Sequence, residues 1–293
     1  MTRRQLRPVL GTLGVVVILL IAWEVAKALA GDPWRFDSFL GTGIAVNFTP
    51  PFKVIQVNDI NLPHVWDVIG AFGDTSASGE TFLASLVGSA LFTLRGAALG
   101  FVLGAAIGLA LAVLLVHTRT LERGIVPLLV ASQTIPIVAI APLVVVGLKA
   151  GWLGVAIVAT YLTFFPVTIA AIRGLRAADP RAFELLRSYA ATPGSILTKL
   201  RFPASAPYVF TAFKVSATAS VVGAIVGEFP AGIRDGLGGA LLQAMQYYSI
   251  SPGRLWAAIL VTALVGIGAF LLVVVAERRA LRSYRPIDLG AGA

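Results

Sequence analysis

The sequence of 293 residues contains no cysteine and only two histidines, and charged residues make up only 13% of it. The absence of cysteine excludes disulfides, thiolate metal sites and cysteine nucleophiles. An ordinary soluble domain carries about 25% charged residues, whereas this chain is 57% hydrophobic and has a mean hydropathy of +0.88. The period-two alternation of membrane β-strands is also absent, and only helices or closed barrels cross lipid. The composition therefore predicts an all-α polytopic membrane protein.

A phosphate-binding loop is missing as well. No lysine lies in a G-x-x-x-x-G-K-[ST] motif, so the chain is not by itself a P-loop ATPase. No group of His, Asp and Glu residues has the spacing of a metal site or an active site, so we expect neither a bound metal nor an enzyme. The pI near 10.4 reflects basic residues that follow the pattern of cytoplasmic membrane loops, and we expect no nucleic-acid partner.

Six apolar runs are each long enough to cross a hydrocarbon core about 30 Å thick. They cover residues 9–29, 95–116, 125–148, 152–172, 207–229 and 255–276. Arginine and lysine gather in the segments on one side of these runs, including residues 173–206, and are sparse on the other side. The positive-inside rule therefore predicts a multi-pass protein of the cell (inner) membrane with both termini in the cytoplasm.

The runs also predict how the chain is divided. We expect a first transmembrane helix at residues 1–30, an extracytoplasmic loop at 31–80 and a short cytoplasmic tail at 283–293. Residues 81–282 would form a core of about five transmembrane helices, with a cytoplasmic loop at 175–206.

Two points near the N-terminus stay open. The basic start, the apolar run and Ala28-Leu29-Ala30 resemble a cleavable signal peptide, but Glu24 and Lys27 interrupt the approach to that site. We expect a retained span in which these two residues pair, because they lie three positions apart on a helix. Residues 81–94 form either an interfacial helix or the first part of a long span.

A glycine ladder runs through the second apolar run, "GAALGFVLGAAIG". Gly96, Gly100, Gly104 and Gly108 recur every four residues, which places them on one stripe of a helix. Missing side chains let a second helix approach closely. Because glycine offers a solute no side-chain chemistry, we interpret the ladder as a packing surface rather than a pore lining.

Five other residues are candidates for a solute path. Pro136 and Pro142 interrupt the third run, close to Gln133, and Pro166 interrupts the fourth. Proline kinks a helix, and discontinuous helices often line solute paths, although kinks that serve packing alone would explain the same pattern. Glu228 lies at the outer end of the fifth run, and ionisable residues within spans are functional candidates.

The segment between the fourth and fifth runs is unusual because capping residues and prolines divide it. Asp179-Pro180 predicts a helix start, because Asp caps and Pro suits the first helical position. That helix should reach about residue 191, with Phe183, Leu186 and Ala190 on one face.

A second short helix should follow in the same segment. Thr192-Pro193 repeats the start signal, Phe202-Pro203 is expected to break this helix, and Pro207 can open the fifth span. Short helices are marginal in water without a tertiary partner. The segment therefore docks either on another protein or on the chain's own bundle.

Residues 184–203 resemble the cytoplasmic signature of the permease subunits of binding-protein-dependent ABC importers. That signature reads Glu-Ala-Ala, three residues, Gly, nine residues, Ile, one residue, Leu-Pro. With Pro203 as the anchor, Glu184 takes the glutamate position and Ala190 the glycine position. Leu185 and Leu186 depart from the two alanines.

Further stretches extend the resemblance to about residues 62–282. They are "LPHVWDVIGAF", "SQTIPIVAIAPLVVVGLKAG" and the stretch from "GLGGALLQAMQYYSISPGRLW" to "AERR". These resemble the subgroup that handles nitrate, sulfonates, taurine and pyrimidine vitamin precursors. "FFPV" and "KVSATASVVGAIVGEF" resemble its pyrimidine or riboflavin-type members.

The resemblance implies a type I ABC importer permease fold and a translocation path driven by a separate cytoplasmic ATPase, which would bind ATP and Mg²⁺ in place of any cofactor in this chain. Other implied partners are an extracytoplasmic solute-binding protein, a second permease copy in a homodimer, and membrane lipid. The residues of the implied ATPase-coupling loop are Glu184, Leu186, Arg187, Ala190, Gly194 and Pro203. A secondary transporter or channel acting alone, and a membrane-embedded enzyme, are the alternative functions. The sequence does not identify the substrate.

Overall fold

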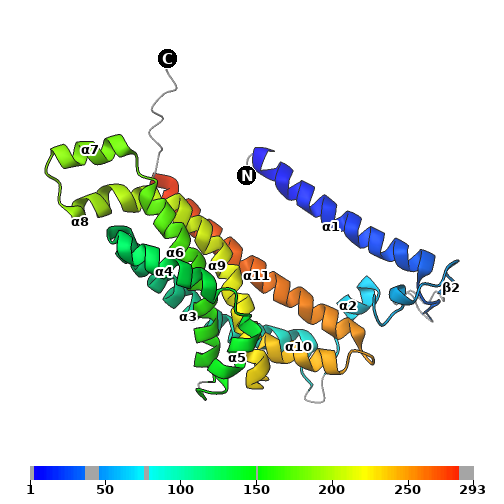
Figure 1. Ribbon diagram of the computed structural model, residues 1–293. Coiled ribbons are helices and arrows are strands. Elements are labelled where there is room, and N and C mark those ends of the chain that lie inside the picture. The colour runs from blue at the N-terminus through cyan, green and yellow to red at the C-terminus, as the bar shows by residue number, and fades with distance from the viewer. Residues whose placement is uncertain (1–2, 37–45, 76–78, 150, 284–293) are drawn as a thin grey trace. The chain divides into compact units, whose positions relative to one another are not determined.

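The computed structural model describes residues 3–36, 46–75, 79–149 and 151–283. Apart from two three-residue strands, β1 (Trp34–Phe36) and β2 (Val46–Phe48), its regular structure is helical (Figure 1). The predicted all-α class is therefore confirmed. The helices of at least seven residues are α1 (Arg3–Ala30), α2 (Val65–Ala71), α3 (Phe82–His117), α4 (Arg119–Ser132), α5 (Ile137–Val145), α6 (Trp152–Arg176), α7 (Pro180–Ser188), α9 (Phe202–Ala231), α10 (Leu237–Gln246) and α11 (Pro252–Ala280).

Five helical segments among the described residues are long and apolar enough to cross a membrane. They are Gly11–Ala30, Phe82–His117, Trp152–Arg176, Pro193–Pro230 and Pro252–Ala280. A sixth crossing is made only if α4 and α5 act together, because the chain bends by 91° between them. The predicted run at 125–148 is thus interrupted, as its prolines indicated: a break of four residues that ends in Pro136 separates two shorter helices.

The helix α3 is one continuous helix of 36 residues. At 1.5 Å per residue it is roughly 54 Å long, well beyond the thickness of a hydrocarbon core. Of the two alternatives for residues 81–94, the structure shows the long span rather than a separate interfacial helix.

The chain forms two compact units, one made of Met1–Ser85 with Gln243–Leu260 and the other of Leu86–Leu242 with Val261–Ala293. In the first unit, the end of α1 is tied to the segment that follows it. Lys27, which is fully buried, bonds to the Asp59 carboxylate and to the Leu62 carbonyl at 2.7 Å. Glu24 bonds to His64 Nδ1 at 2.8 Å and accepts from the Val65 amide at 2.7 Å.

These contacts correct the expected pairing of Glu24 with Lys27. Each of the two residues instead has a partner more than thirty positions away, in the segment between α1 and α2. Nearby, burial raises the pKa of the Asp67 carboxyl on α2, and the His64 imidazole partly offsets that rise.

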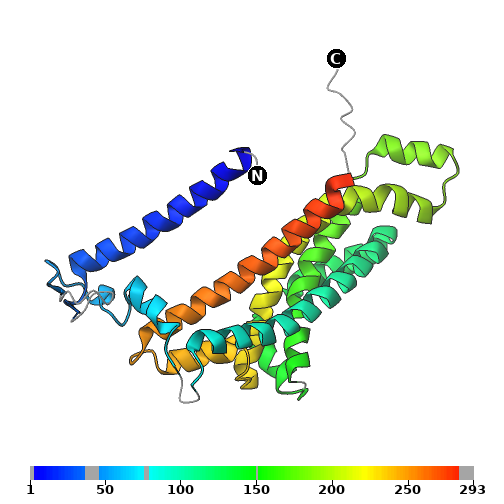
Figure 2. The same cartoon turned by 180° about the vertical axis from the view of Figure 1, so that it is seen from behind.

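The second unit is a bundle in which α6 lies against both α3 and α9. Its buried core includes Ala112 and Leu115 of α3, Ala171 and Leu175 of α6, and Val209 of α9. A helical hairpin that contains α7 and α8 (Pro193–Ile196) extends past the ends of α6 and α9 in both views (Figures 1 and 2).

The junction between the hairpin and α9 is helical throughout. A π-helical turn, η3 (Leu197–Arg201), joins α8 to α9, so that Pro193–Pro230 forms one helical segment of 38 residues. The expected break at Phe202-Pro203 is therefore wrong. Pro203 lies in the first turn of α9, where a missing amide proton does little harm, and the π-turn shifts the backbone register just before it.

Candidate functional site

The first helix of the hairpin, α7, is closed at both ends by local hydrogen bonds. Asp179 caps its start, since the side chain accepts from the Arg181 amide at 2.8 Å, and Pro180 takes the first helical position. At the other end the Ala190 amide donates to the Arg187 carbonyl, and the Ala191 amide to the Leu186 carbonyl. This pair of bonds is the Schellman motif, which satisfies carbonyls that a helix end leaves free.

Ala190 has a left-handed backbone with φ of +52°. The expected helix to residue 191, with Ala190 on its apolar face, is therefore wrong: α7 ends at Ser188 and Ala190 forms the turn. A left-handed conformation costs an L-residue about 1–2 kcal/mol, which glycine does not lose. Ala190 was aligned with the signature glycine, and the geometry supplies the physical reason for glycine at that position.

One face of α7 packs inward through Phe183. The guanidinium groups of Arg187 and Arg201 each lie 5.4 Å from the centre of its ring. Arg201 belongs to η3, so the two cation–π contacts fix α7 against the helical segment that continues as α9. Leu186, the other residue expected on this face, is half-buried.

The opposite face of α7 is open and apolar. Leu185 is 56% exposed and Tyr189 is 76% exposed, and their spacing of four places them together on the surface. Glu184, next to Leu185 in the sequence, is exposed as well, and Arg187 is exposed on the side of the helix that carries Phe183. The sequence comparison had marked Leu185 only as a departure from alanine, and Tyr189 had not been singled out. Two large apolar residues four positions apart on a short, charged helix were the sequence signal that could have predicted this exposed face.

The return arm of the hairpin holds the last two coupling candidates. Gly194 follows the Thr192 cap and is exposed, with no atom within 4 Å of where a Cβ would stand. Pro203 is half-buried in the first turn of α9. Neither lies on the open face of α7, so the structure does not bring all six candidates together.

The four ladder glycines all lie at the contact between α3 and α6. A Cβ on Gly96 would lie 3.1 Å from Val155, and one on Gly100 or Gly104 would lie 2.8 Å from a backbone carbonyl of α6. A Cβ on Gly108 would lie 2.7 Å from the Phe164 carbonyl. Because backbone atoms cannot move aside as side chains do, Gly100, Gly104 and Gly108 are required for the helix contact, whereas a side chain at Gly96 would press only on the Val155 side chain.

Further glycines bring other helices equally close to α6, and the sequence analysis did not identify them. A Cβ on Gly223 of α9 would lie 3.0 Å from the Ala159 Cα, and one on Gly227 3.2 Å from the Val155 Cα. Gly174, at the other end of α6, leaves room for the Ser205 Cα. The spacing of four between Gly223 and Gly227 repeats the ladder signal and could have revealed this contact.

Glu228 lies fully buried at the far end of α9. Its carboxylate accepts from the Thr93 hydroxyl at 2.8 Å and from the Gly238 amide at 2.7 Å, while the Leu237 amide donates to Thr93 at 2.9 Å. Glu228 and Thr93 together therefore cap the start of α10. A Cβ on Gly236 would collide with the Glu228 carboxylate, so the backbone at Gly236 packs directly against that carboxylate. In this state Glu228 is a structural anchor rather than a group that faces a solute.

The break between α4 and α5 contains two more path candidates. Gln133 ends α4, and its buried side-chain amide nitrogen has no hydrogen-bond partner. Pro136 precedes α5 and Pro142 lies inside it. The Tyr161 hydroxyl of α6 donates to the Ser132 carbonyl and so satisfies one acceptor freed by the break.

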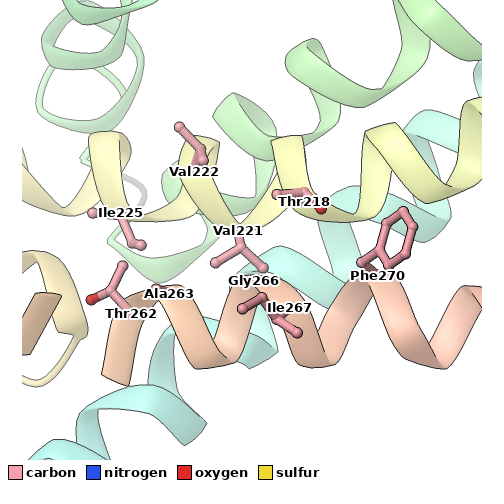
Figure 3. A pocket seen from close by; sticks show the side chains of 9 residues that line it. All are labelled: Thr218, Val221, Val222, Ile225, Thr262, Ala263, Gly266, Ile267 and Phe270. Atoms are coloured by element: carbon pink, nitrogen blue, oxygen red, sulfur yellow. The ribbon is translucent and has the colours of Figure 1, made fainter. Parts of the chain in front are cut away.

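Two grooves run along α9. One, of about 630 Å³, lies between α6 and α9 and includes Pro166, with Arg173 as its charged residue. The other, of about 340 Å³, lies between α9 and α11 and is almost wholly apolar (Figure 3). Its lining residues are Thr218, Val221, Val222, Ile225, Thr262, Ala263, Gly266, Ile267 and Phe270.

Within the described residues, no three His, Asp or Glu side chains gather as a metal site would require. The site features are instead an open apolar face on α7, helices packed through glycine, and apolar grooves. This set suits a membrane transport component.

Comparison with known proteins agrees with this description. A family model described as "Binding-protein-dependent transport system inner membrane component" matches residues 96–282. The formylaminopyrimidine transport permease protein ThiX of Halalkalibacterium halodurans is 34% identical over 168 residues, 56% of this chain and 64% of that protein. The riboflavin transport system permease protein RibX of Chloroflexus aurantiacus is 30% identical over 275 residues, 94% of this chain and 90% of that protein.

The match to ThiX thus spans less than two thirds of that protein's length, whereas the match to RibX spans most of both chains. The family model alone covers well over half of the present chain. The resemblance found in the sequence is confirmed, and the chain belongs to the family of inner membrane components of binding-protein-dependent ABC transport systems, which are permease subunits rather than enzymes.

Proposed function

We propose that this chain is the permease subunit of an ATP-driven importer and that the exposed face of α7 docks in a groove of a separate cytoplasmic ATPase. The open pair Leu185 and Tyr189 carries this proposal, because two large apolar side chains lie next to each other on the exposed face of α7, where a groove of a partner could cover both. Glu184 and Arg187 are exposed on the same short helix, and their charges would orient it as it docks.

The proposal assigns ATP binding and substrate capture to partner proteins. The chain has no phosphate-binding loop, so ATP and Mg²⁺ would be held by the ATPase subunits. A solute-binding protein would deliver the substrate from outside, and a second copy of this chain would complete the path as a homodimer within membrane lipid. The basic segment that contains α7 would face the cytoplasm, with both termini on the same side if α4 and α5 together make one crossing.

The proposed substrate is a small organic or anionic nutrient. The printed names of two relatives specify formylaminopyrimidine and riboflavin, both of which are nitrogen heterocycles. The sequence subgroup also includes carriers of nitrate, sulfonates and taurine. Riboflavin and a pyrimidine precursor are therefore the first compounds to test, followed by taurine and nitrate.

The test is assembly and coupling in the complete transporter. Leu185→Glu or Glu184→Lys on α7 should abolish or greatly weaken co-purification of the ATPase, because each changes the docking face without touching the bundle. Thr198→Ala is the matched control, since Thr198 is also exposed in the hairpin but lies on η3. Pull-down and ATP-dependent uptake should be normal in the control.

Unchanged ATPase binding and unchanged coupled uptake in both α7 variants would contradict the docking role. The stand-alone alternative makes a different prediction. If the chain alone, in vesicles without other protein, accumulates a solute against its gradient, the chain is a secondary transporter and not a subunit of an ATP-driven one.

A further inference from the structure

An ion pair joins Lys214, inside the apolar run 207–229 on α9, to Glu277, which directly follows the apolar run 255–276 on α11. Lys214 Nζ donates to both carboxylate oxygens of Glu277, at 3.1 and 2.9 Å. The two side chains are only 21% and 20% exposed, and both helices are long and apolar enough to cross a membrane. Charged residues at such positions are costly and commonly have a function. The two residues are 63 positions apart in the sequence, so no local pattern predicts their pairing.

The pair lies in line with the apolar groove of Figure 3. Lys214 precedes Thr218 by one turn on α9, and Glu277 follows Phe270 by two turns on α11, so each continues the stripe that forms a groove wall. On α9 this is the direction of the hairpin. The ion pair therefore lies just beyond the end of the groove that is nearer the coupling loop.

The two groove walls are connected to the hairpin in different ways. The α9 wall belongs to the unbroken segment Pro193–Pro230, so any displacement of the hairpin reaches it through the backbone. The α11 wall has no such connection, because α11 follows α10 in the chain. Along the groove the contacts are apolar and non-directional, and they allow one helix to slide on the other.

We propose that Lys214 and Glu277 are positioning residues for transport: their ion pair makes α11 follow α9 when the ATPase moves the hairpin. This inference rests on the proposed function, since it needs a partner that moves the hairpin. Among the described residues it is the one salt bridge between these two helices. It is doubly hydrogen-bonded and largely shielded from solvent, so it resists sliding where the apolar contacts do not.

The test follows the two helices separately in the complete complex with its ATPase. The chain has no cysteine, so spin labels attach only at introduced ones. One label pair joins Val102 on α3 to Tyr208 on α9, and the other joins Val102 to Leu272 on α11; all three side chains are exposed. The distances are measured with and without ATP, and no substrate is needed.

The variants are Lys214→Met, Glu277→Gln and the exchanged pair K214E/E277K. In both single variants the ATP-dependent shift of α9 should remain and that of α11 should be lost, and the exchanged pair should restore it. Lys199→Met is the matched control, because it removes a lysine that is exposed on the same helical segment, and it should behave as wild type.

An α11 shift that persists in both single variants overturns the inference. The inference is also overturned if the exchanged pair K214E/E277K binds the ATPase but shows no ATP-dependent shift of α11. If the single variants fail to fold, the exchanged pair decides alone, because a purely local role for either charge would not be rescued by reversing both. A wild-type complex in which neither helix responds to ATP contradicts the proposed function itself, which separates the two failures.

Discussion

The hairpin and the glycine-packed bundle are opposite solutions to holding helices in place. In the hairpin, α7 is fixed by a cap at Asp179, a Schellman end at Ala190 and two cation–π contacts, while its outer face is open. In the bundle, α3 and α9 approach α6 so closely at the contact glycines that there is no room for even a methyl group in place of the glycine hydrogen.

The difference shows where each region tolerates change. The hairpin is stabilised by hydrogen bonds close in sequence, so its exposed side chains are free to serve a partner. The bundle is stabilised by contacts between backbones far apart in sequence, so a single added atom acts on the whole packing. If α7 docks as proposed, the adaptable surface lies in the first region, whereas the second region tolerates little added side-chain volume.

The largest expected effect is at the contact between α3 and α6. Gly100→Leu with Gly104→Leu should prevent the bundle from forming, since each new side chain would overlap the backbone of α6. Even Gly104→Ala should destabilise the fold by about 1–3 kcal/mol. Thermal unfolding of detergent-solubilised protein measures both changes.

Gly88 supplies the control in the same helix. A Cβ there would meet nothing within 4 Å, so Gly88→Ala should be neutral or stabilise by up to about 1 kcal/mol through helix propensity. Normal expression, stability and uptake of the double leucine variant would remove the glycine contact from the account of the bundle.

A smaller effect is expected from the buried carboxylate of Glu228. Glu228→Ala leaves the Gly238 amide without its acceptor and removes the bond from Thr93, at a cost of about 2–3 kcal/mol. Glu184→Ala on the open face of α7 should leave the unfolding temperature of the isolated chain unchanged. Glu228→Ala and Glu184→Ala thus remove the same residue type from the bundle and from the hairpin, and thermal unfolding measures both. Equal losses of stability would contradict the difference between the two regions.

The smallest effect concerns the turn at the end of α7. Ala190→Gly should stabilise the hairpin by about 1 kcal/mol, because glycine adopts the left-handed conformation without steric cost. Gly194 lies nearby in the hairpin, but its φ is not positive and a Cβ there would meet no atom within 4 Å. Gly194→Ala should therefore not destabilise the hairpin through backbone strain. Protection of the hairpin from limited proteolysis reports the change, and faster cleavage of the Ala190→Gly variant than of the wild type would show that the turn is not strained.

The parts of the structure that follow from local rules were predictable. Asp179 and Thr192 begin helices as capping residues do, and long apolar runs form the crossings. The glycine spacing indicated a close helix contact, although not that α6 would be the helix in contact.

The errors arose where distant partners decide. Glu24 and Lys27 are near each other in sequence, but His64 and Asp59 provide better-placed partners once the segment between α1 and α2 folds back onto α1. The sequence did not show that a π-turn would let the helix pass Pro203, nor that a Schellman end would force an alanine into a left-handed turn. In each case, a tertiary or backbone contact outweighed a local preference.

The unbroken helical segment Pro193–Pro230 has a consequence for the opposite side of the molecule. The backbone stays helical from the return arm of the hairpin into α9, although its direction changes at the π-turn η3 (Figures 1 and 2), and Glu228 near the far end of α9 caps α10. If the hairpin docks as proposed, a displacement there would reach the start of α10 along a single helix, without passing through a loop.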